Sequence, residues 1–317
     1  MSTTLALATR GLAKRFGSRV ALDGLDLSVP SGVVYGFLGP NGAGKTTTMR
    51  ILTGLIHADA GSVEVLGQPF GRGSRRRLFD VGALIESPAF YPYLSGRENL
   101  RALAATGAPT PRRRVDEVLD VVGLGDRARD RVGGYSLGMK QRLAIGAALL
   151  SDPRLLLLDE PANGLDPAGI VGMRDTLRNL AATGKTVFVS SHILGEVQQL
   201  AEMVGIIARG RLISEGPIAG LLAAGGSIRI RVAAEDAARA ATILDGVAGA
   251  GATTRVDGDE GWLGVRFDPD RAGELNRALA TSGIYASRIE LRSDLESVFL
   301  ELTAAPAGEA PGLGGVQ

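Results

Sequence analysis

The residues with the clearest chemical role form a glycine-rich stretch that ends in a lysine and two threonines. Residues 39–47 fit the pattern G-x-x-x-x-G-K-[ST] of a phosphate-binding loop. The motif needs a strand before it and a helix after it, and the segments 33–38 and 45–53 are typical of these, which disfavours a chance lysine in a glycine-rich turn. In such a loop, backbone N–H groups surround phosphate oxygens, Lys45 supplies a positive charge and the Thr46 hydroxyl a ligand for Mg²⁺. The residues expected to hold the phosphates are Gly39, Pro40, Asn41, Gly42, Ala43, Gly44, Lys45, Thr46 and Thr47.

A second group of candidate residues follows an apolar strand. Four leucines at 155–158 lead directly into Asp159 and Glu160, the form that a second Mg²⁺ ligand and a water-activating acid take in P-loop nucleotidases. A further predicted strand, 186–190, is followed by a serine and His192. These residues extend the phosphate-binding loop into a candidate site of nucleotide hydrolysis.

The order of the motifs narrows the choice among the families of P-loop nucleotidases. After the loop come Ser136, which is placed to cap a helix running to Leu149, the run of leucines with its two acids, Gly-Leu-Asp at 164–166 and Ser-Ser-His at 190–192. This order resembles the ATP-binding cassette of ABC transporters over about residues 5–223. The resemblance implies an α/β P-loop NTPase fold with a RecA-like core, an antiparallel β subdomain and a helical insert. It also implies ATPase activity.

The resemblance implies a role for each matching residue within one cassette. Lys45 and the loop amides would bind the phosphates of ATP, and Thr46 and Asp159 would hold Mg²⁺. Glu160 would be the general base that polarises the attacking water, and His192 would contact the γ-phosphate.

Other matching residues would act across a dimer. Ser136 and Gly138 would contact the γ-phosphate of the opposite protomer, and Asp166 would lie at the interface, so that two cassettes close head to tail on two ATP molecules. A helix N-terminus with a serine hydroxyl is a second anion site, useful only when a partner supplies it. The family usually has Leu-Ser-Gly-Gly-Gln in this segment. Leu137 replaces a glycine here, and we expect backbone strain if that position requires a positive φ.

The loop that begins at Glu86 is predicted to link the site to a partner. Glutamate stands here where the family usually has a glutamine that contacts Mg²⁺ and faces the transmembrane subunit, and the surrounding residues resemble the bacitracin and lantibiotic self-protection exporters, which carry glutamate there. The loop also holds Phe90, Tyr91 and Tyr93 in a chain with 4% aromatic residues. Aromatic residues favour a docking patch, and a cluster that packs the loop onto its own domain is the alternative. We therefore expect a permease to contact the segment from Glu86 to Leu94.

Other segments are expected to build the frame of the site. The alternating pattern within 5–29 predicts antiparallel strands. Phe16 lies at a turn within it, where its ring could stack on adenine or simply pack, and the sequence favours neither interpretation. Helical spacing at 97–105 and 112–122 predicts the helical insert, and the arginines at 112–114 are expected to be solvated.

The pattern changes after the first domain, which we place at 1–223. A second domain is expected at 224–303, with a β-α-β-β-α-β order that is ferredoxin-like. Residues 295–303 resemble the closing helix of the C-terminal extension in the same exporter subfamily, and 304–317 are expected to be a disordered tail. One hypothesis makes this domain a ligand sensor that gates the cassette.

Composition restricts the classes of function. A length of 317 residues suits two domains, and a formal net charge of +1 without a basic stripe argues against a nucleic-acid partner. The absence of cysteine excludes disulfides and thiolate metal sites. No apolar run approaches the ~18 residues of a membrane span, so the permease is expected to be a separate chain.

These observations predict the ATP-hydrolysing subunit of an exporter of drugs or antibiotic peptides. It would work as a homodimer with ATP and Mg²⁺, bound peripherally to its permease at the cytoplasmic face of the membrane. The alternative is a soluble ABC ATPase that acts on nucleic acid or ribosomes. Such proteins carry two cassettes or long coiled coils between the motifs, whereas this chain has one G-x-x-x-x-G-K.

Overall fold

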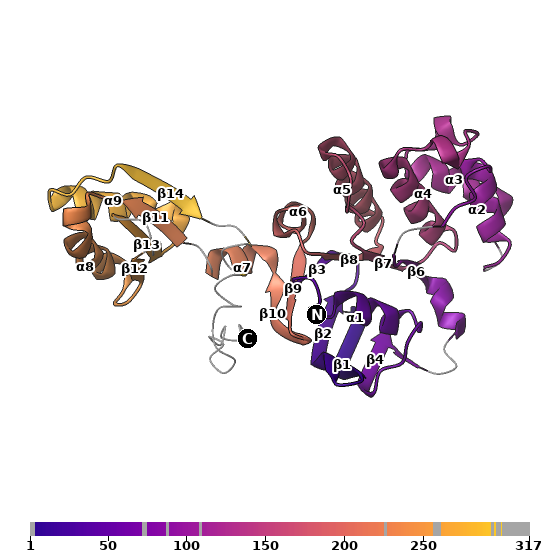
Figure 1. Cartoon of the computed structure of the whole chain (residues 1–317), viewed down its shortest axis with the longest axis horizontal. Helices are drawn as coiled ribbons and strands as arrows, with labels where there is room; N and C mark the ends of the chain where they lie inside the picture. The colour runs from indigo at the N-terminus through magenta and orange to yellow at the C-terminus, as the bar shows by residue number, and fades with distance from the viewer. Residues whose placement is uncertain are drawn as a thin grey trace. The chain divides into compact units, whose positions relative to one another are not determined.

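The computed structural model describes residues 4–71, 75–86, 89–107, 110–224, 227–255 and 261–292, together with residues 295 and 299. The chain divides into two compact units, Met1–Gly216 and Pro217–Gln317 (Figure 1). The division falls before α7 (Ile218–Ala224), a helix that lies within the range predicted for the first domain. Among the described residues, no helix has the length and hydrophobicity that crossing a bilayer requires.

A six-stranded sheet forms the centre of the first unit, in the order β10-β9-β3-β8-β7-β6. Its strands are β3 (Val34–Leu38), β6 (Val81–Leu84), β7 (Leu155–Asp159), β8 (Thr186–Ser191), β9 (Met203–Ala208) and β10 (Arg211–Pro217). β3 runs parallel to β8 and β9, and β7 runs parallel to β6 and β8. Every residue of β3 and β8 is buried, as expected for parallel strands covered on both faces. The carboxyl ends of these strands therefore meet at one edge of the sheet.

The expected antiparallel strands form a second sheet in the same unit, in the order β2-β1-β4-β5. Its strands are β1 (Leu5–Phe16), β2 (Arg19–Pro30), β4 (Ala60–Val65) and β5 (Gln68–Phe70). Helix α1 (Lys45–Leu52) buries Met49 and Leu52 in a core that includes Leu25 of β2 and Phe37 of β3. One hydrophobic core thus joins both sheets and seats the helix that follows the phosphate-binding loop.

A single carboxylate also joins the two sheets. Oε1 of Glu215 on β10 accepts a hydrogen bond from the Tyr35 hydroxyl of β3 at 2.6 Å and another from the Ser28 N–H of β2 at 2.9 Å. Tyr35 is fully buried and stacks on Phe188 of β8. Burial, together with the adjacent carboxylate, raises the pKa of Tyr35 well above its ordinary value.

The predicted helical insert is present as α2 (Gly96–Ala104) and α3 (Arg112–Val121), which lie beside α4 (Leu137–Leu149) (Figure 1). Ser95 and Glu98 form a capping box at the start of α2. The remaining helices of this unit are α5 (Pro167–Ala182) and α6 (Leu194–Leu200), and its short 3₁₀ turns are η1 (Arg75–Asp80), η2 (Gly125–Arg127) and η3 (Val132–Gly134).

The second unit has the predicted β-α-β-β-α-β order. Its elements after α7 are β11 (Ser227–Arg231), η4 (Ala234–Asp236), α8 (Ala237–Ala248), β12 (Thr253–Arg255), β13 (Trp262–Arg266), η5 (Pro269–Arg271), α9 (Ala272–Thr281) and β14 (Arg288–Arg292). The strands pair antiparallel in the order β12-β13-β11-β14, the ferredoxin-like arrangement. Ile228 and Ile230 of β11 and Leu275 of α9 lie in its core. The predicted helix 295–303, apart from Leu295 and Phe299, and the predicted tail 304–317 lie outside the described residues.

Candidate nucleotide-binding site

A cavity of about 420 Å³ lies at the edge of the central sheet where the parallel strands end. It brings together residues that are far apart in the sequence. Its lining residues are Phe16, Arg19 and Ala21 from the antiparallel sheet, Asn41, Gly42, Gly44, Lys45, Thr46 and Thr47 from the phosphate-binding loop, and Glu160, Asn163 and His192 from beyond β7 and β8.

The backbone of the loop explains why glycine occupies two of its positions. Gly44 has a φ of 117°, and a Cβ there would lie 2.7 Å from Cδ2 of Leu22 and 2.8 Å from the Ala21 carbonyl oxygen. At Gly39 a Cβ would lie 2.3 Å from the Ile207 carbonyl oxygen. The N-cap residue of α1 is Gly44, which has no side chain to accept from the N–H groups of the first turn. The loop therefore presents N–H groups at a helix N-terminus, the arrangement that binds phosphate.

Lys45 lies at the centre of the site and is almost fully buried. Its Nζ donates to the Gly39 carbonyl at 2.7 Å and lies 3.3 Å from Oε1 of Glu160. The ammonium group thus contacts both the loop that would hold phosphate and the acid predicted to activate water.

The predicted catalytic acid and histidine are in direct contact. Nδ1 of His192 lies 2.7 Å from Oε2 of Glu160. The Glu160 N–H donates to the Ser190 carbonyl at 3.2 Å, because β7 and β8 pair with Asp159 opposite Ser190. Glu160 has a φ of 49°, which turns the chain sharply away from the end of β7. Strand register and this turn together bring the carboxylate to the imidazole.

The predicted Mg²⁺ ligands meet part of what this ion requires. Thr46 lines the cavity, and Asp159 accepts a hydrogen bond from the Ser190 hydroxyl. Within the described ranges, no group of three or more His, Asp or Glu side chains is arranged to hold a metal. Mg²⁺ is commonly held by one or two protein groups, several waters and substrate phosphates, so the Thr46 hydroxyl and the Asp159 carboxylate, which ends β7 and does not line the cavity, fit this ion.

Glu86 does not line this cavity. Its carboxylate forms an ion pair with Arg50 of α1, and both side chains are largely solvated, with exposed fractions of 62% and 41%. Glu86 has a φ of 71°, a left-handed conformation that is uncommon for glutamate. Its expected place at Mg²⁺ therefore requires its release from Arg50.

The residues predicted to act across a dimer lie at two helix N-termini. The Ser136 hydroxyl caps α4 by accepting from the Met139 N–H at 3.3 Å, and Asp166 caps α5 by accepting from the Gly169 N–H at 3.0 Å. Leu137 begins α4 and is not among the residues with a positive φ, so the strain considered for this position is absent. Neither Ser136 nor Gly138 lines the cavity of its own chain.

Two residues at or near the site were not predicted from the sequence, Arg19 and Glu196. Arg19 lies opposite Phe16 in the β1–β2 hairpin, and both line the cavity, which supports the adenine-facing interpretation of Phe16. Burial raises the pKa of Glu196 on α6, and His192 and Glu160 are close enough to influence it in opposite directions. Neither Arg19 nor Glu196 belongs to a motif, because their positions depend on tertiary structure.

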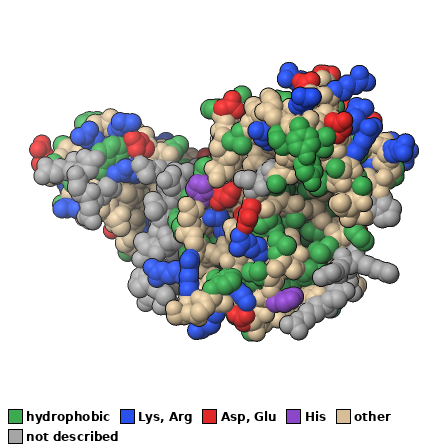
Figure 2. Space-filling model, turned by 45° about the vertical axis from the view of Figure 1, so that its right-hand side comes forward, with side chains coloured by type: hydrophobic (Ala, Val, Ile, Leu, Met, Phe, Trp, Pro, Cys, Tyr) green, Lys and Arg blue, Asp and Glu red, His purple; other side chains and the backbone are tan. Residues whose placement is uncertain are grey.

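The loop at 89–94 exposes two tyrosines, and hydrogen bonds to Asn99 hold its backbone. Tyr91 and Tyr93 are 54% and 64% exposed, and their ring centroids lie 5.8 Å apart. The buried Asn99 side chain accepts from the Tyr91 N–H at 2.8 Å and donates to its carbonyl at 3.1 Å. Phe90 is partly buried, while residues 87–88 lie outside the described part of the chain. Figure 2 brings the region of α2 to α4 forward and shows hydrophobic side chains exposed there among basic ones.

Comparisons with known proteins agree with this architecture. The ABC transporter family model matches residues 22–163. The bacitracin transport ATP-binding protein of Enterococcus faecalis is 37% identical, over 93% of this chain and 96% of that protein, and the namesake from Bacillus licheniformis is 47% identical over 68% and 71%. A daunorubicin resistance ATP-binding protein of Streptomyces coeruleorubidus is 40% identical over 94% and 96%.

Solved structures lead to the same family. The ADP conformation of an ATP-binding cassette of an ABC transporter superposes with a TM-score of 0.62 at 25% identity, covering 68% of this chain and 92% of that one. The family model covers the phosphate-binding loop, and relatives more than 30% identical extend over nearly the whole length. The chain belongs to the ATP-binding proteins of ABC transporters, which are ATPases.

Proposed function

We propose that this chain is the ATP-hydrolysing subunit of an ABC exporter that removes an antibiotic, bound at the cytoplasmic face of the membrane to a separate permease. The observation that carries the proposal is the convergence of Lys45, Glu160 and His192 at the phosphate-binding loop. The relatives support the antibiotic class, because they are named for bacitracin transport and daunorubicin resistance.

Glu160 would act as the general base. In the structure its carboxylate lies 3.3 Å from Nζ of Lys45 and 2.7 Å from Nδ1 of His192. When the γ-phosphate enters, Lys45 turns to the phosphate and leaves Glu160 free to accept a proton from a water that attacks phosphorus. The bond to the leaving oxygen breaks, and ADP and phosphate result. Mg²⁺ held by Thr46 and Asp159 would neutralise the phosphate charge when bound.

Two cassettes would share each ATP. The loop amides and Lys45 would bind the phosphates, while the N-terminus of α4, with Ser136 and Gly138, would meet the γ-phosphate from the partner. Both residues lie outside their own chain's cavity, which supports a role in trans. Asp166 would lie at the same interface. Tyr91 and Tyr93 would transmit this closure to the permease, since exposed aromatic pairs are typical of interface centres.

The test is substitution of the general base. Glu160→Gln keeps the shape of the side chain but cannot accept the proton, so we expect ATP binding to persist, turnover to fall by about 10²-fold or more, and an ATP-bound dimer to accumulate. Nucleotide affinity, phosphate release and sedimentation measure these three results. Repeated turnover at the wild-type rate would remove Glu160 from its role. Lys45→Ala is the matched control, because it should weaken nucleotide binding itself.

A further inference from the structure

The turn between α4 and β7 determines how two parts of the proposed site are oriented. α4 begins at the Ser136 cap and ends at Leu149, and β7 ends beside Glu160. Residues 150–154 therefore connect the helix that Ser136 caps to the strand that leads into the general base. Asp152 lies in this turn with a φ of 53°.

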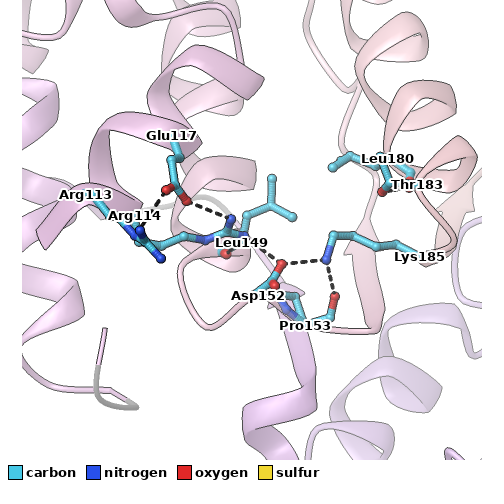
Figure 3. Close-up of polar contacts among 9 residues, drawn as sticks. All are labelled: Arg113, Arg114, Glu117, Leu149, Asp152, Pro153, Leu180, Thr183 and Lys185. Atoms are coloured by element: carbon cyan, nitrogen blue, oxygen red, sulfur yellow. Dashed lines mark hydrogen bonds and ion pairs between the residues drawn. The ribbon is translucent and has the colours of Figure 1, made fainter. Parts of the chain in front are cut away.

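The Asp152 carboxylate accepts hydrogen bonds from two cationic side chains that come from different parts of the chain (Figure 3). Its Oδ1 accepts from Nη2 of Arg114 on α3 at 2.9 Å and from Nζ of Lys185, just before β8, at 2.8 Å. The Lys185 hydrogen bond, with a further contribution from the charge of Arg114, lowers the pKa of Asp152 below its ordinary value. The side chains of Arg114 and Lys185 are only 20% and 18% exposed, so the expectation that arginines 112–114 are solvated is wrong for Arg114.

Each cation also binds a backbone carbonyl of the turn. Arg114 Nη2 donates to the Leu149 carbonyl at 2.9 Å, and Lys185 Nζ donates to the Pro153 carbonyl at 2.9 Å. Arg114 therefore connects α3 to the last residue of α4 and to Asp152. Lys185 connects two segments that both lead into the central sheet.

The carboxyl end of α4 is fixed against that sheet. A Cβ on Gly82 of β6 would lie 2.2 Å from the carbonyl oxygen of Ala148, so the helix end packs directly on the strand. The Arg154 carbonyl accepts from the Thr186 N–H at 2.9 Å, a link that duplicates the one made by Lys185. The end of α4 that bears Ser136 lies at the far side of a helix about 20 Å long.

We propose that Arg114, acting through Asp152, is a positioning residue for ATP hydrolysis that sets the tilt of α4 and hence the place of Ser136 at the partner's nucleotide. The inference rests on the proposed closure of two cassettes around ATP. The carboxyl end of α4 is held by its packing on β6 and by the chain that leads into β7, and the bonds of Arg114 add a link to α3 that constrains the direction of the helix. A tilt of about 5° would move the far end of a 20 Å helix by about 1.7 Å, and displacements of this size cost about 10²-fold in rate at reacting groups.

Arg114 and Lys185 form a matched pair for the test. Each makes one bond to Oδ1 of Asp152 and one to a backbone carbonyl, at nearly equal lengths and exposures, and Arg114 also pairs with Glu117 of its own helix at 3.4 Å. Only Arg114 belongs to the helical insert. Arg114→Met and Lys185→Met retain most of each aliphatic stem and remove the charge, so their stabilities should be similar.

The experiment compares wild type, Arg114→Met and Lys185→Met as full-length chains. We expect Arg114→Met to bind ATP as a monomer like wild type but to lose about 10- to 100-fold in kcat, with a matching loss of ATP-driven dimerisation in the Glu160→Gln background. Lys185→Met should stay within about threefold of wild type, because the Thr186 link remains. Arg114→Lys, which keeps a cation, should recover part of the loss.

The outcomes separate this inference from the proposed function. Equal kcat losses in the two Met variants at similar melting temperatures, or no loss in Arg114→Met, would overturn the role of Arg114. If Arg114→Met does not fold, Arg114→Lys carries the comparison, since it keeps the charge on a stem that differs in length and geometry from that of arginine. Ser136→Ala tests the proposed function. If ATP drives dimerisation of neither wild type nor any variant, the proposed closure of two cassettes is refuted. If only Ser136→Ala impairs dimerisation, the role of Arg114 alone is refuted.

Discussion

Substitutions at Glu86 and Arg50 should shift the Mg²⁺ requirement of ATP hydrolysis in opposite directions. The structure pairs these two side chains, and both are largely exposed. If the Glu86 carboxylate moves to Mg²⁺ when nucleotide binds, the ion pair with Arg50 competes with the metal. Glu86→Gln removes the metal ligand, while Arg50→Met removes its competitor.

The magnitudes follow from the charges and their exposure. An exposed ion pair contributes about 0.5 to 1 kcal/mol, so Arg50→Met should lower the Mg²⁺ concentration for half-maximal rate by about 2- to 5-fold. A unit charge pair at ~5 Å with an effective dielectric of about 20 is worth roughly 3 kcal/mol, which attracts the carboxylate to the metal and repels it from the phosphate. We expect the metal to dominate, because a carboxylate is a better ligand than an amide for a hard cation. After subtraction of the ion pair, about 2 kcal/mol remains, an upper limit of about 30-fold for the rise in Glu86→Gln.

The assay is phosphate release at fixed ATP while Mg²⁺ is varied, for wild type and both variants. Rates at saturating Mg²⁺ should remain similar, since neither residue lines the nucleotide cavity. Superimposable curves for wild type and Glu86→Gln would falsify the metal role and leave Glu86 as a permease-facing or inert residue. A shift of both variants in the same direction would refute the competition.

Three further predictions concern the loop, the aromatic patch and the turn. Gly44→Ala should abolish nucleotide binding and lower the free energy of unfolding by about 1 to 3 kcal/mol, because its φ is 117° and a Cβ would contact β2. Calorimetry measures the first effect and urea unfolding the second. Full ATP affinity would contradict the loop geometry. Replacing Tyr91 and Tyr93 together by Ser should leave basal ATPase activity intact and weaken pull-down with the permease, whereas a lowered melting temperature would favour the self-packing alternative. The pKa of Asp152 in the folded protein lies below its unfolded value of about 3.9, so the stability that this carboxylate contributes is complete above that pH and is lost as pH falls through the folded pKa. Thermal melts between about pH 3 and 6 should therefore show a steeper fall in melting temperature with acid for wild type than for Asp152→Asn.

The sequence predicted those parts of the fold and site that depend on local pattern. The phosphate-binding loop has its strand and helix, α2 and α3 begin within a residue of the expected positions, and the second unit has the ferredoxin-like order. Local motifs succeed here because phosphate-binding geometry depends on glycines and amides that are adjacent in the chain. The roles assigned to individual site residues remain predictions.

Contacts between distant segments could not be predicted in this way. Arg19 reaches the cavity only because the β1–β2 hairpin folds beside the loop, and Glu86 meets Arg50 only because β6 ends near α1. The pattern predicts Arg114 within a solvated run of arginines, and the prediction is wrong because its acceptors lie 35 and 38 positions further along the chain. A periodic pattern describes one element at a time, so it does not predict which other element will pack against it.

The carboxylate of Glu215 has a consequence for the order in which the cassette is made. Its two hydrogen bonds join residues separated by 187 and 180 positions, to Ser28 and Tyr35. A ribosome releases the phosphate-binding loop early but the strand carrying Glu215 near the end of the first unit. Until then the Tyr35 hydroxyl lacks this acceptor and the two sheets lack this shared contact. This contact between the two sheets can therefore form only after synthesis of β10, and a nascent chain arrested before it should be open to proteases at its antiparallel sheet.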